Sequence, residues 1–305
     1  MKLFDLHCDT ISEMKKGGFG FEDNPLHISG SKASGFLPYI QVCAVWTDSS
    51  LSDGDAWTEF FKVTDYFRGT VKTDFIKNSA SLRDTADKGG RGFILACEGA
   101  RLLCGDIDRL DRLYAEGVRV LTLVWAGSDI IGGAHGTDDP LTPFGKQVVE
   151  KCFDIGIIPD ISHASRASAK EVLDIAASFG KAPCATHSNS YSLHSHQRNL
   201  TDGEFSYIIS LGGIVGVSLC PEHLAAGGAA VGDIVRHIMY YINKGGISSV
   251  ALGCDFDGIG TVPDGICDIS CLDRLYYALC SAGLSEDEAE QVFFANAYRF
   301  MMQNL

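Results

Sequence analysis

Eight short apolar segments, rich in β-branched residues, recur along this 305-residue chain and constrain its fold more than any other feature. Each is apolar almost throughout, which is typical of parallel strands that are covered on both faces. The segments span residues 3–8, 40–46, 92–97, 118–125, 157–162, 182–186, 213–219 and 249–254. This pattern predicts eight buried strands.

Helical patterns separate many of these segments, at residues 56–75, 106–116, 143–155, 165–179, 232–244 and 285–302. The last begins with a capping box formed by Ser285 and Glu288. Strands that alternate with helices predict an α/β fold, a (β/α)8 TIM-type barrel, with a doubly wound open sheet as the alternative. No linker, repeat or low-complexity segment marks a boundary, so we expect a single domain over residues 1–305.

Composition excludes some classes of partner. The formal net charge is −14 and the pI is near 5.0, which argues against binding to nucleic acid or to an anionic membrane surface. No segment approaches the roughly 20 apolar residues of a membrane span. Met1 and Lys2 lead straight into the first strand, without an apolar signal region. The eleven cysteines include no C-x-x-C pair, so we expect free, mostly buried thiols and a cytoplasmic protein.

Histidines and carboxylates follow five of the predicted strands. Alternation along the first strand places Asp5, His7 and Asp9 on one face. A His-x-Asp pair alone is more often a surface pair than a metal site. Here, however, strand ends also carry Glu98, His163, His187 and Asp255. In a barrel these ends surround one mouth. Three histidines and three carboxylates suffice for two metal ions that share a carboxylate, and they suit Zn(II), with Mn(II) or Co(II) also compatible.

Three cysteines lie next to these candidate ligands, at Cys8, Cys97 and Cys254. Strand alternation turns their side chains to the opposite face, toward the helices. We therefore interpret them as small buried residues rather than as metal ligands.

Several longer motifs carry a family resemblance that covers nearly the whole chain. They are FDLHCDT, CEGA around Glu98, LTPFGKQVVE, DISHAS around His163, THSNSYS around His187, HQRNL around Arg198 and GCDFDG around Asp255. Together they resemble the membrane (renal) dipeptidase family, zinc peptidase family M19, within the amidohydrolase-like barrels. Any one motif alone is much less specific.

The resemblance implies a role for each of these residues. His7 and Asp9 would hold a first zinc ion, Glu98 would bridge, His163 and His187 would hold a second zinc ion, Asp255 would handle the proton, and Arg198 would bind the terminal carboxylate of the substrate. The implied reaction is hydrolysis of a small dipeptide with a free C-terminal carboxylate, by a hydroxide held between the two zinc ions.

One position departs from the family pattern. Family members carry a histidine after the Leu-Thr-Leu run of the fourth strand, where this chain has Trp125. An indole donates one hydrogen bond but carries no proton in catalysis. His135, in the glycine-rich stretch 127–140, either reaches the substrate or is a solvated loop residue. Trp125 and His135 are thus candidate substrate-binding residues.

Two other functions stay open. One is another dinuclear metal hydrolase on the same barrel, such as a lactonase, deaminase or phosphoesterase. Many of these bridge their metals with a carboxylated lysine, and no lysine stands at a strand end here. The other is a non-catalytic metal-binding protein, which would need neither Asp255 nor Arg198. Relatives are often dimers, so a homodimer also stays open, beside a small dipeptide as the expected substrate.

Overall fold

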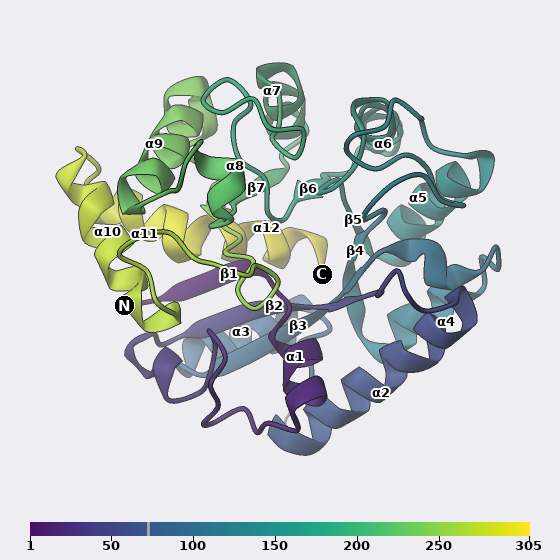
Figure 1. The fold of residues 1–305 in the computed structure, drawn as a ribbon, viewed down its shortest axis with the longest axis horizontal. Helices are drawn as coiled ribbons and strands as arrows, with labels where there is room; N and C mark the ends of the chain where they lie inside the picture. Colours follow the sequence, from purple (N-terminus) through teal and green to yellow (C-terminus); the bar gives the residue numbers. More distant parts are fainter. Residues whose placement is uncertain (72–73) are drawn as a thin grey trace.

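The eight predicted strands form one closed parallel barrel, in which each strand pairs with its neighbours in chain order (Figure 1). This confirms the TIM-type barrel and excludes the open sheet. The computed structural model describes residues 1–71 and 74–305. Its strands are β1 (Leu3–Cys8), β2 (Tyr39–Trp46), β3 (Arg91–Glu98), β4 (Val118–Thr122), β5 (Ile158–Asp160), β6 (Cys184–Ala185), β7 (Ile214–Val217) and β8 (Val250–Leu252).

The second half of the barrel has shorter strands than the apolar segments suggested. The predicted strand 118–125 ends at Thr122, so Trp125 lies beyond the ladder. The segment 182–186 pairs only over Cys184–Ala185, and the backbone N–H groups of Thr186 and His187 donate to side-chain oxygens of Asp160 and Ser162 instead of to a strand neighbour. Apolar sequence therefore marked where the chain is buried, while ladder pairing stops a few residues earlier.

The main helices are α1 (Thr10–Gly17), α2 (Asp53–Val71), α3 (Ser79–Asp87), α4 (Arg109–Glu116), α5 (Pro143–Ile155), α6 (Arg166–Phe179), α7 (Asp202–Ser210), α8 (Pro221–Leu224), α9 (Val231–Tyr241), α10 (Leu272–Ser281), α11 (Glu286–Glu290) and α12 (Asn296–Asn304). Short 3-10 turns lie at Lys32–Gly35, Ala100–Leu103 and Ile269–Cys271, and π-helical turns at Ile242–Gly246 and Gln291–Ala295. The sequence analysis did not predict α1, α3, α7, α8 or α10.

Two of the predicted helices begin and end where local chemistry demands, whereas the helix predicted at 106–116 begins only at Arg109 and the one predicted at 232–244 ends at Tyr241. The helix at 143–155 has Pro143 in its first turn and a Thr142 cap that accepts from Gly145 N, and it ends at Gly156 with a left-handed φ of 88°. The helix predicted at 165–179 takes Ser165 as its cap. The pattern 56–75 is realised as α2 over Asp53–Val71; residues 72–73 lie outside the described part of the chain, and residues 74–75 are not helical, so the predicted end was wrong. The pattern 285–302 is broken by the π-helical turn between α11 and α12.

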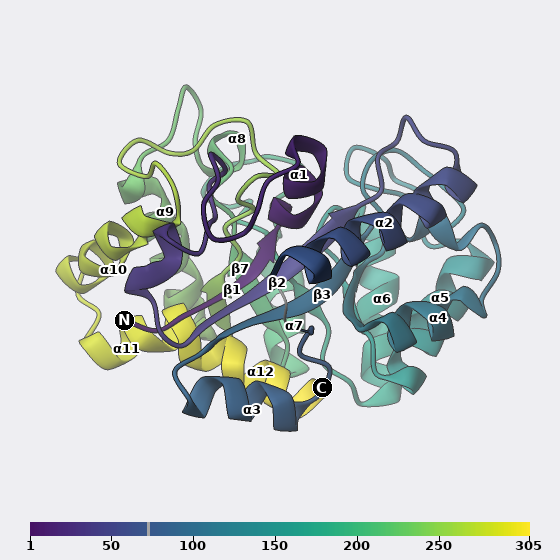
Figure 2. The ribbon, with the colours of Figure 1, turned by 90° about the horizontal axis from the view of Figure 1, so that it is seen from below.

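An inner apolar cluster fills the barrel and draws residues from all eight strands. Its members include Phe4, Leu6, Ile40, Ile94, Val120, Ile158, Cys184, Ile214 and Ala251. Phe294, Phe300 and Met301 belong to the same cluster, so the C-terminal helical segment closes one end of the barrel. Figure 2 shows α12 and α3 on that side, with α1 and α8 on the other. The carboxyl ends of the strands, with the polar residues that follow them, remain free for a site.

Strand alternation misplaced one residue of β1. Phe4 and Leu6 both belong to the inner cluster, so Asp5 between them faces outward, away from His7. The register of β1 against β2 shifts between Asp5 and Cys8, and this irregularity turns His7 into the mouth. Oδ1 of Asp5 accepts from the backbone N–H of Cys254 at 2.8 Å and from that of His7 at 3.3 Å. Asp5 thus supports the joint between β1 and β8 instead of leading into the site.

The cysteines follow the sequence interpretation in most places. Cys8, Cys97 and Cys254 are fully buried in the outer cluster between strands and helices, as expected. Cys267 and Cys271 form a disulfide, which corrects the expectation that all eleven thiols are free. Cys104 is exposed, and Cys220 and Cys280 are half-buried. Among the described residues, no helix combines the length and apolarity needed to cross a membrane.

Candidate metal centre and active site

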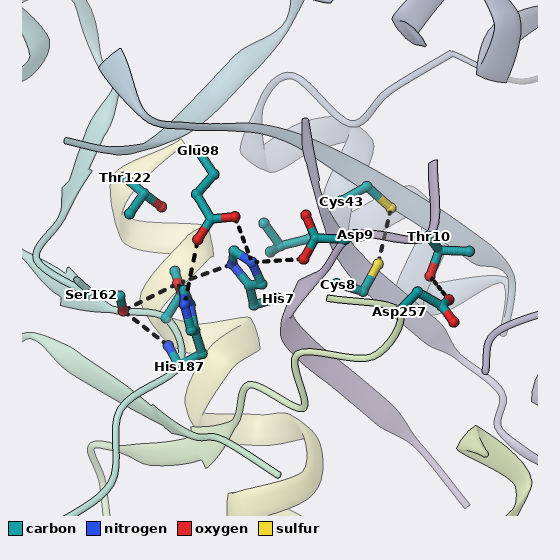
Figure 3. Close-up of polar contacts among 12 residues, drawn as sticks. His7, Cys8, Asp9, Thr10, Cys43, Glu98, Thr122, Ser162, His187 and Asp257 are labelled. Carbon is teal, nitrogen blue, oxygen red and sulfur yellow. Dashed lines mark hydrogen bonds and ion pairs between the residues drawn. The ribbon is translucent and has the colours of Figure 1, made fainter. Parts of the chain in front are cut away.

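Glu98, the last residue of β3, lies at the centre of the mouth with its two oxygens facing different groups. Oε1 lies 3.0 Å from Nε2 of His163 and 3.6 Å from Nε2 of His187. Oε2 lies 3.6 Å from Nε2 of His7, which is in turn 3.5 Å from Oδ2 of Asp9. Figure 3 shows His7, Asp9, Glu98 and His187 pointing toward one another. The five predicted ligands therefore meet in one place, divided by the Glu98 carboxylate into two groups.

Each histidine of this group has its other ring nitrogen bound. Nδ1 of His163 lies 2.9 Å from the carbonyl oxygen of Trp125. Nδ1 of His187 lies 2.8 Å, and Nδ1 of His7 3.3 Å, from Oγ1 of Thr186. A carbonyl oxygen accepts only, so Nδ1 of His163 carries the proton and Nε2 keeps a free lone pair. Such outer contacts fix the tautomer and orient the ring for metal ligation through Nε2.

A buried hydrogen-bond network supports the histidines from inside the barrel, and the sequence analysis did not assign it a role. Oδ2 of Asp160 accepts from the hydroxyls of Thr122 and Thr186, each at 2.6 Å. Oδ1 of Asp160 accepts from the backbone N–H groups of Ser162 and Thr186, each at 2.9 Å. Since the single hydroxyl proton of Thr186 goes to Asp160, its lone pairs face the histidines, which must donate from Nδ1.

Two glycines let the neighbouring strands approach this network. A Cβ at Gly216 would lie 1.9 Å, and one at Gly253 1.7 Å, from the carbonyl oxygen of Thr186. Any side chain at either position would displace Thr186 and, through it, two ring nitrogens. The glycines thereby fix the position of the hydroxyl on which the histidines rest.

Electrostatic coupling within the group is strong. Burial lowers the pKa of His7, but the carboxylates of Glu98 and Asp9 outweigh it and raise that pKa well above its ordinary value. Burial and the charge of Glu98 raise the pKa of Asp9 to about 6. For Glu98, burial opposes ionisation, yet His7 and His163 hold its pKa well below the usual range. Acidic and imidazole side chains buried together in this way require an added cation or a proton between them.

Asp255 follows β8 and lies beside the first group. One oxygen of Asp255 groups with one ligand atom each of His7 and Asp9, all within 4.8 Å of one another. Burial raises the pKa of Asp255 to about 8, against the opposing charges of His7 and Arg198. Its φ of 61° lies in the left-handed region, as does the φ of His163 at 72°. A non-glycine residue in that region costs on the order of 1–3 kcal/mol, and such strain clusters at functional sites.

Asp257, which the sequence analysis treated as a turn anchor, connects two loops. Its Oδ2 accepts from the Thr10 hydroxyl at 2.6 Å, and its Oδ1 accepts from the backbone N–H of His27 at 2.6 Å. The backbone N–H of Asp257 donates to Nδ1 of His27 at 3.0 Å. The loop after β8, which carries Asp255, is thus bound to the chain that follows β1.

Arg198 is buried near this group, on the loop that follows β6. It is 6% exposed, and neither Nη1 nor Nη2 has a hydrogen-bond partner among the described residues. Burial lowers the pKa of Arg198, while the carboxylates of Asp255 and Glu98 offset part of this effect. A buried guanidinium without a partner is costly, so the two free Nη groups are positioned to receive an anion of the ligand.

Trp125 and His135 both reach the mouth. The Trp125 ring packs on the ring of Trp46, with centroids 4.9 Å apart, and both line a cavity of about 130 Å³ together with Glu98, His163 and Asp255. His135 is half-buried with its ring centroid 5.5 Å from that of His163, so it is not a solvated loop residue. Burial and the charge of Arg198 lower the pKa of His135 to about 4. Trp46 was predicted only as the end of a strand.

The donor set fits two divalent ions. Nε2 of His7 and Oδ1 of Asp9 are buried without a hydrogen-bond partner in the described part of the chain. Nε2 of His163 and Nε2 of His187 lie 3.0 Å apart while both face one oxygen of Glu98, an arrangement that a shared cation satisfies. Neutral imidazoles and carboxylates without thiolates suit Zn(II).

A model of the family described as "Membrane dipeptidase (Peptidase family M19)" matches residues 1–304. The chain belongs to this family. It is 29% identical over 247 residues to an uncharacterized dipeptidase of Schizosaccharomyces pombe, covering 78% of this chain and 56% of that protein. The matched region thus spans little more than half of that relative's length.

Two solved metallopeptidase structures share the fold of this family member. The crystal structure of the dipeptidase AC, a metallopeptidase of family M19, superposes with a TM-score of 0.92 at 23% identity, covering 100% of this chain and 98% of that chain. A metallopeptidase from Rhodobacter sphaeroides, solved with a phosphinate mimic of the dipeptide L-Ala-D-Ala, superposes with a TM-score of 0.88 at 22% identity, covering 100% and 99%. At these identities the likeness concerns the fold.

Proposed function

We propose that this M19 family member is a zinc-dependent dipeptidase, which hydrolyses the peptide bond of small dipeptides with a free C-terminal carboxylate. The observation that carries the proposal is the buried guanidinium of Arg198, which has no partner among the described residues and lies near the divided ligand group around Glu98. A neutral lactone offers no anion to this guanidinium, whereas the free C-terminal carboxylate of a dipeptide does.

Each residue has one task in the proposed reaction. His7 and Asp9 would hold one zinc ion, His163 and His187 the other, and Glu98 would bind both. When bound, the ions supply Lewis-acid polarisation of the scissile carbonyl and acidify water. Arg198 binds the C-terminal carboxylate through both Nη groups and so fixes the peptide bond over Glu98. Asp255 accepts the proton of the attacking water and returns it to the leaving amine.

A short substrate agrees with the size of the site. The cavity beside Glu98 has a volume of about 130 Å³, and Trp46 and Trp125 border it. The R. sphaeroides structure with a phosphinate mimic of L-Ala-D-Ala supports a dipeptide as the substrate class. We propose that Trp125 contacts the substrate by packing and by its single N–H, and that His135 contributes a neutral ring beside Arg198.

The remaining parts of the proposal concern the whole chain. We propose that residues 1–305 act as one catalytic domain and that the protein works in the cytoplasm, which the nine free thiols favour. Its partners are small dipeptides.

The decisive experiment uses the purified protein reconstituted with two equivalents of zinc and a panel of dipeptides, each offered as the free acid and as the C-terminal amide. We expect cleavage of the free acids, detected by the amines released, and at least a hundredfold lower kcat/KM for the amides. Arg198→Lys keeps the charge but loses the two-pronged donor, so it should remove most of this discrimination. Equal rates on acids and amides in the unmodified protein would reject the proposal.

A further inference from the structure

A second cavity adjoins the metal site, between α1 and α2. Its volume is about 290 Å³, and it shares two wall residues, Ser12 of α1 and Trp46 of β2, with the cavity beside Glu98. These two residues therefore form a partition with the metal site on one side and the second cavity on the other. None of the roles assigned above uses this second space.

The walls of the second cavity are mostly apolar, and of the three charged side chains at its edge two are paired, while Asp48 accepts from the backbone N–H of Ser50 at 2.8 Å. Phe60 and Val63 of α2 are buried at 1% and 4% exposure, and Leu51 borders the cavity from the loop before α2. Lys16, on the edge, pairs with Glu13 at 2.7 Å, and Glu59 pairs with Lys15. A cavity with this lining favours an apolar group of a ligand over a charged one.

The partition itself carries two polar atoms without partners. Nε1 of Trp46 and Oγ of Ser12 are buried and make no hydrogen bond within the described residues. A buried donor left unsatisfied costs roughly 1–3 kcal/mol, so an acceptor is needed at this position. A dipeptide whose N-terminal side chain entered the second cavity would bring its backbone carbonyl to these two atoms and so supply the acceptor.

The barrel order gives the direction in which a dipeptide would lie. In a closed ring of eight strands in chain order, β1 and β2 stand opposite β5 and β6. Arg198 lies on the loop after β6, whereas Ser12 and Trp46 belong to the β1 and β2 side. A dipeptide whose carboxylate is bound at Arg198 and whose peptide bond lies over Glu98 therefore points its N-terminal residue toward the partition.

We propose that the cavity between α1 and α2 is the subsite for the side chain of the N-terminal residue, and that the enzyme prefers dipeptides in which this residue is large and apolar. This inference rests on the proposed dipeptidase function and adds the substrate class to it. The side chains of Ser12 and Trp46 donate hydrogen bonds to the substrate at the entrance of the subsite. Leu51, Phe60 and Val63 form its apolar wall.

The test compares kcat/KM of the zinc-loaded full chain for Phe-Ala, Leu-Ala and Gly-Ala, and for the reversed Ala-Phe, each with both enantiomers of the C-terminal residue. We expect Phe-Ala and Leu-Ala to exceed Gly-Ala by at least about tenfold, in line with the discrimination apolar pockets achieve. Ala-Phe should show no such gain. Equal values for Phe-Ala and Gly-Ala, or a gain that follows the C-terminal residue, would overturn the subsite.

Two variants sharpen the test. Leu51→Trp fills the cavity from a half-exposed loop position, so folding should be preserved, and it should lower the ratio of Phe-Ala to Gly-Ala at least about tenfold. Leu211→Trp is a matched control at a half-buried position at the end of α7, remote from the mouth, and should leave both values unchanged. An unchanged ratio in Leu51→Trp contradicts the subsite alone. Failure to cleave any dipeptide, Gly-Ala included, rejects the dipeptidase function and the subsite together.

Discussion

Oγ1 of Thr186 lies 2.8 Å from Nδ1 of His187, and its own proton is donated to Asp160. This contact fixes which nitrogen of His187 is free to bind metal. Because the same oxygen lies 3.3 Å from Nδ1 of His7, one hydroxyl orients a ligand in each of the two groups that Glu98 divides.

Removal of this hydroxyl should weaken metal binding without unfolding the barrel. For Thr186→Val we expect a 10–100-fold loss of zinc affinity, the usual effect of losing an outer-sphere partner of a histidine ligand. Competition with a zinc chelator measures it. Thr64→Val is a suitable control, because Thr64 is equally buried but bonds only to the carbonyl of Phe61 in α2. Equal affinities of Thr186→Val and the control would contradict the assigned role.

Replacement of Glu98 tests whether one carboxylate serves both ions. Each oxygen of Glu98 faces a different ligand group, so Glu98→Gln should lower occupancy of both positions below one ion per chain in total. Elemental analysis after zinc reconstitution and dialysis gives the count. Retention of one tightly held ion per chain would show that the two groups bind independently of the bridge.

If Asp255 transfers a proton and does not bind metal, its replacement should lower the rate of hydrolysis and leave the metal content unchanged. Asp255→Asn should keep its zinc and lose kcat by a factor on the order of 10²–10⁴. Asp257→Asn should instead cost stability, because both oxygens of Asp257 accept hydrogen bonds that an amide cannot all accept. Elemental analysis, kcat on the best dipeptide and thermal unfolding of both variants distinguish the roles. If Asp255→Asn loses zinc together with activity, then Asp255 is chiefly a ligand, as its grouping with His7 and Asp9 would permit.

His237 should make the fold sensitive to acid. Nδ1 of this fully buried residue accepts from the backbone N–H of Ser190 at 3.0 Å, and Nε2 lies 3.0 Å from the carbonyl oxygen of Leu224, so the ring is neutral. Burial lowers the pKa of His237 to about 4; nearby charges are Arg236, which lowers it further, and Asp233, which opposes this.

The expected consequence is a loss of stability as the pH falls from the unfolded pKa of 6.5 toward 4, since only the unfolded chain binds the proton in that window. Between pH 7 and pH 5 this amounts to about 2 kcal/mol. Urea unfolding at both values should show that His237→Asn, which keeps an acceptor but does not titrate, loses less stability over this interval than the unmodified protein. Equal losses would mean that His237 is not the group responsible.

The sequence predicted those features that depend on short motifs and on burial. Eight apolar segments sufficed for the barrel, and the positions of His7, Asp9, Glu98, His163 and His187 near the carboxyl ends of strands predicted that they meet at one mouth, as they do. The Thr186–Asp160 contact was not predicted, because it joins two strands whose register no local pattern reveals. Asp5 was misplaced for a similar reason: an irregularity in pairing reverses strand alternation, and nothing in the residue types signals it.

The role proposed for Trp46 could not be predicted from the sequence either. As an aromatic residue at the end of an apolar segment, it has the pattern of any core position, and only the packing of α1 and α2 against β2 leaves a space beside it. Cavities arise from side chains of several elements that are distant in sequence, so they follow from the assembled fold and not from a single segment.

The pairing of β1 with β8 closes the barrel and also brings residues of the site together. These strands share one aligned pair, Asp5 with Leu252, and the carboxylate of Asp5 adds a bond to Cys254 N. Glu98, His163 and His187 lie on segments from β3 to the loop after β6, away from this joint. Asp255 lies beside His7 and Asp9 only because β8 pairs with β1. A change that weakens the β1–β8 joint should therefore disturb the grouping of His7, Asp9 and Asp255 before it disturbs the other three residues.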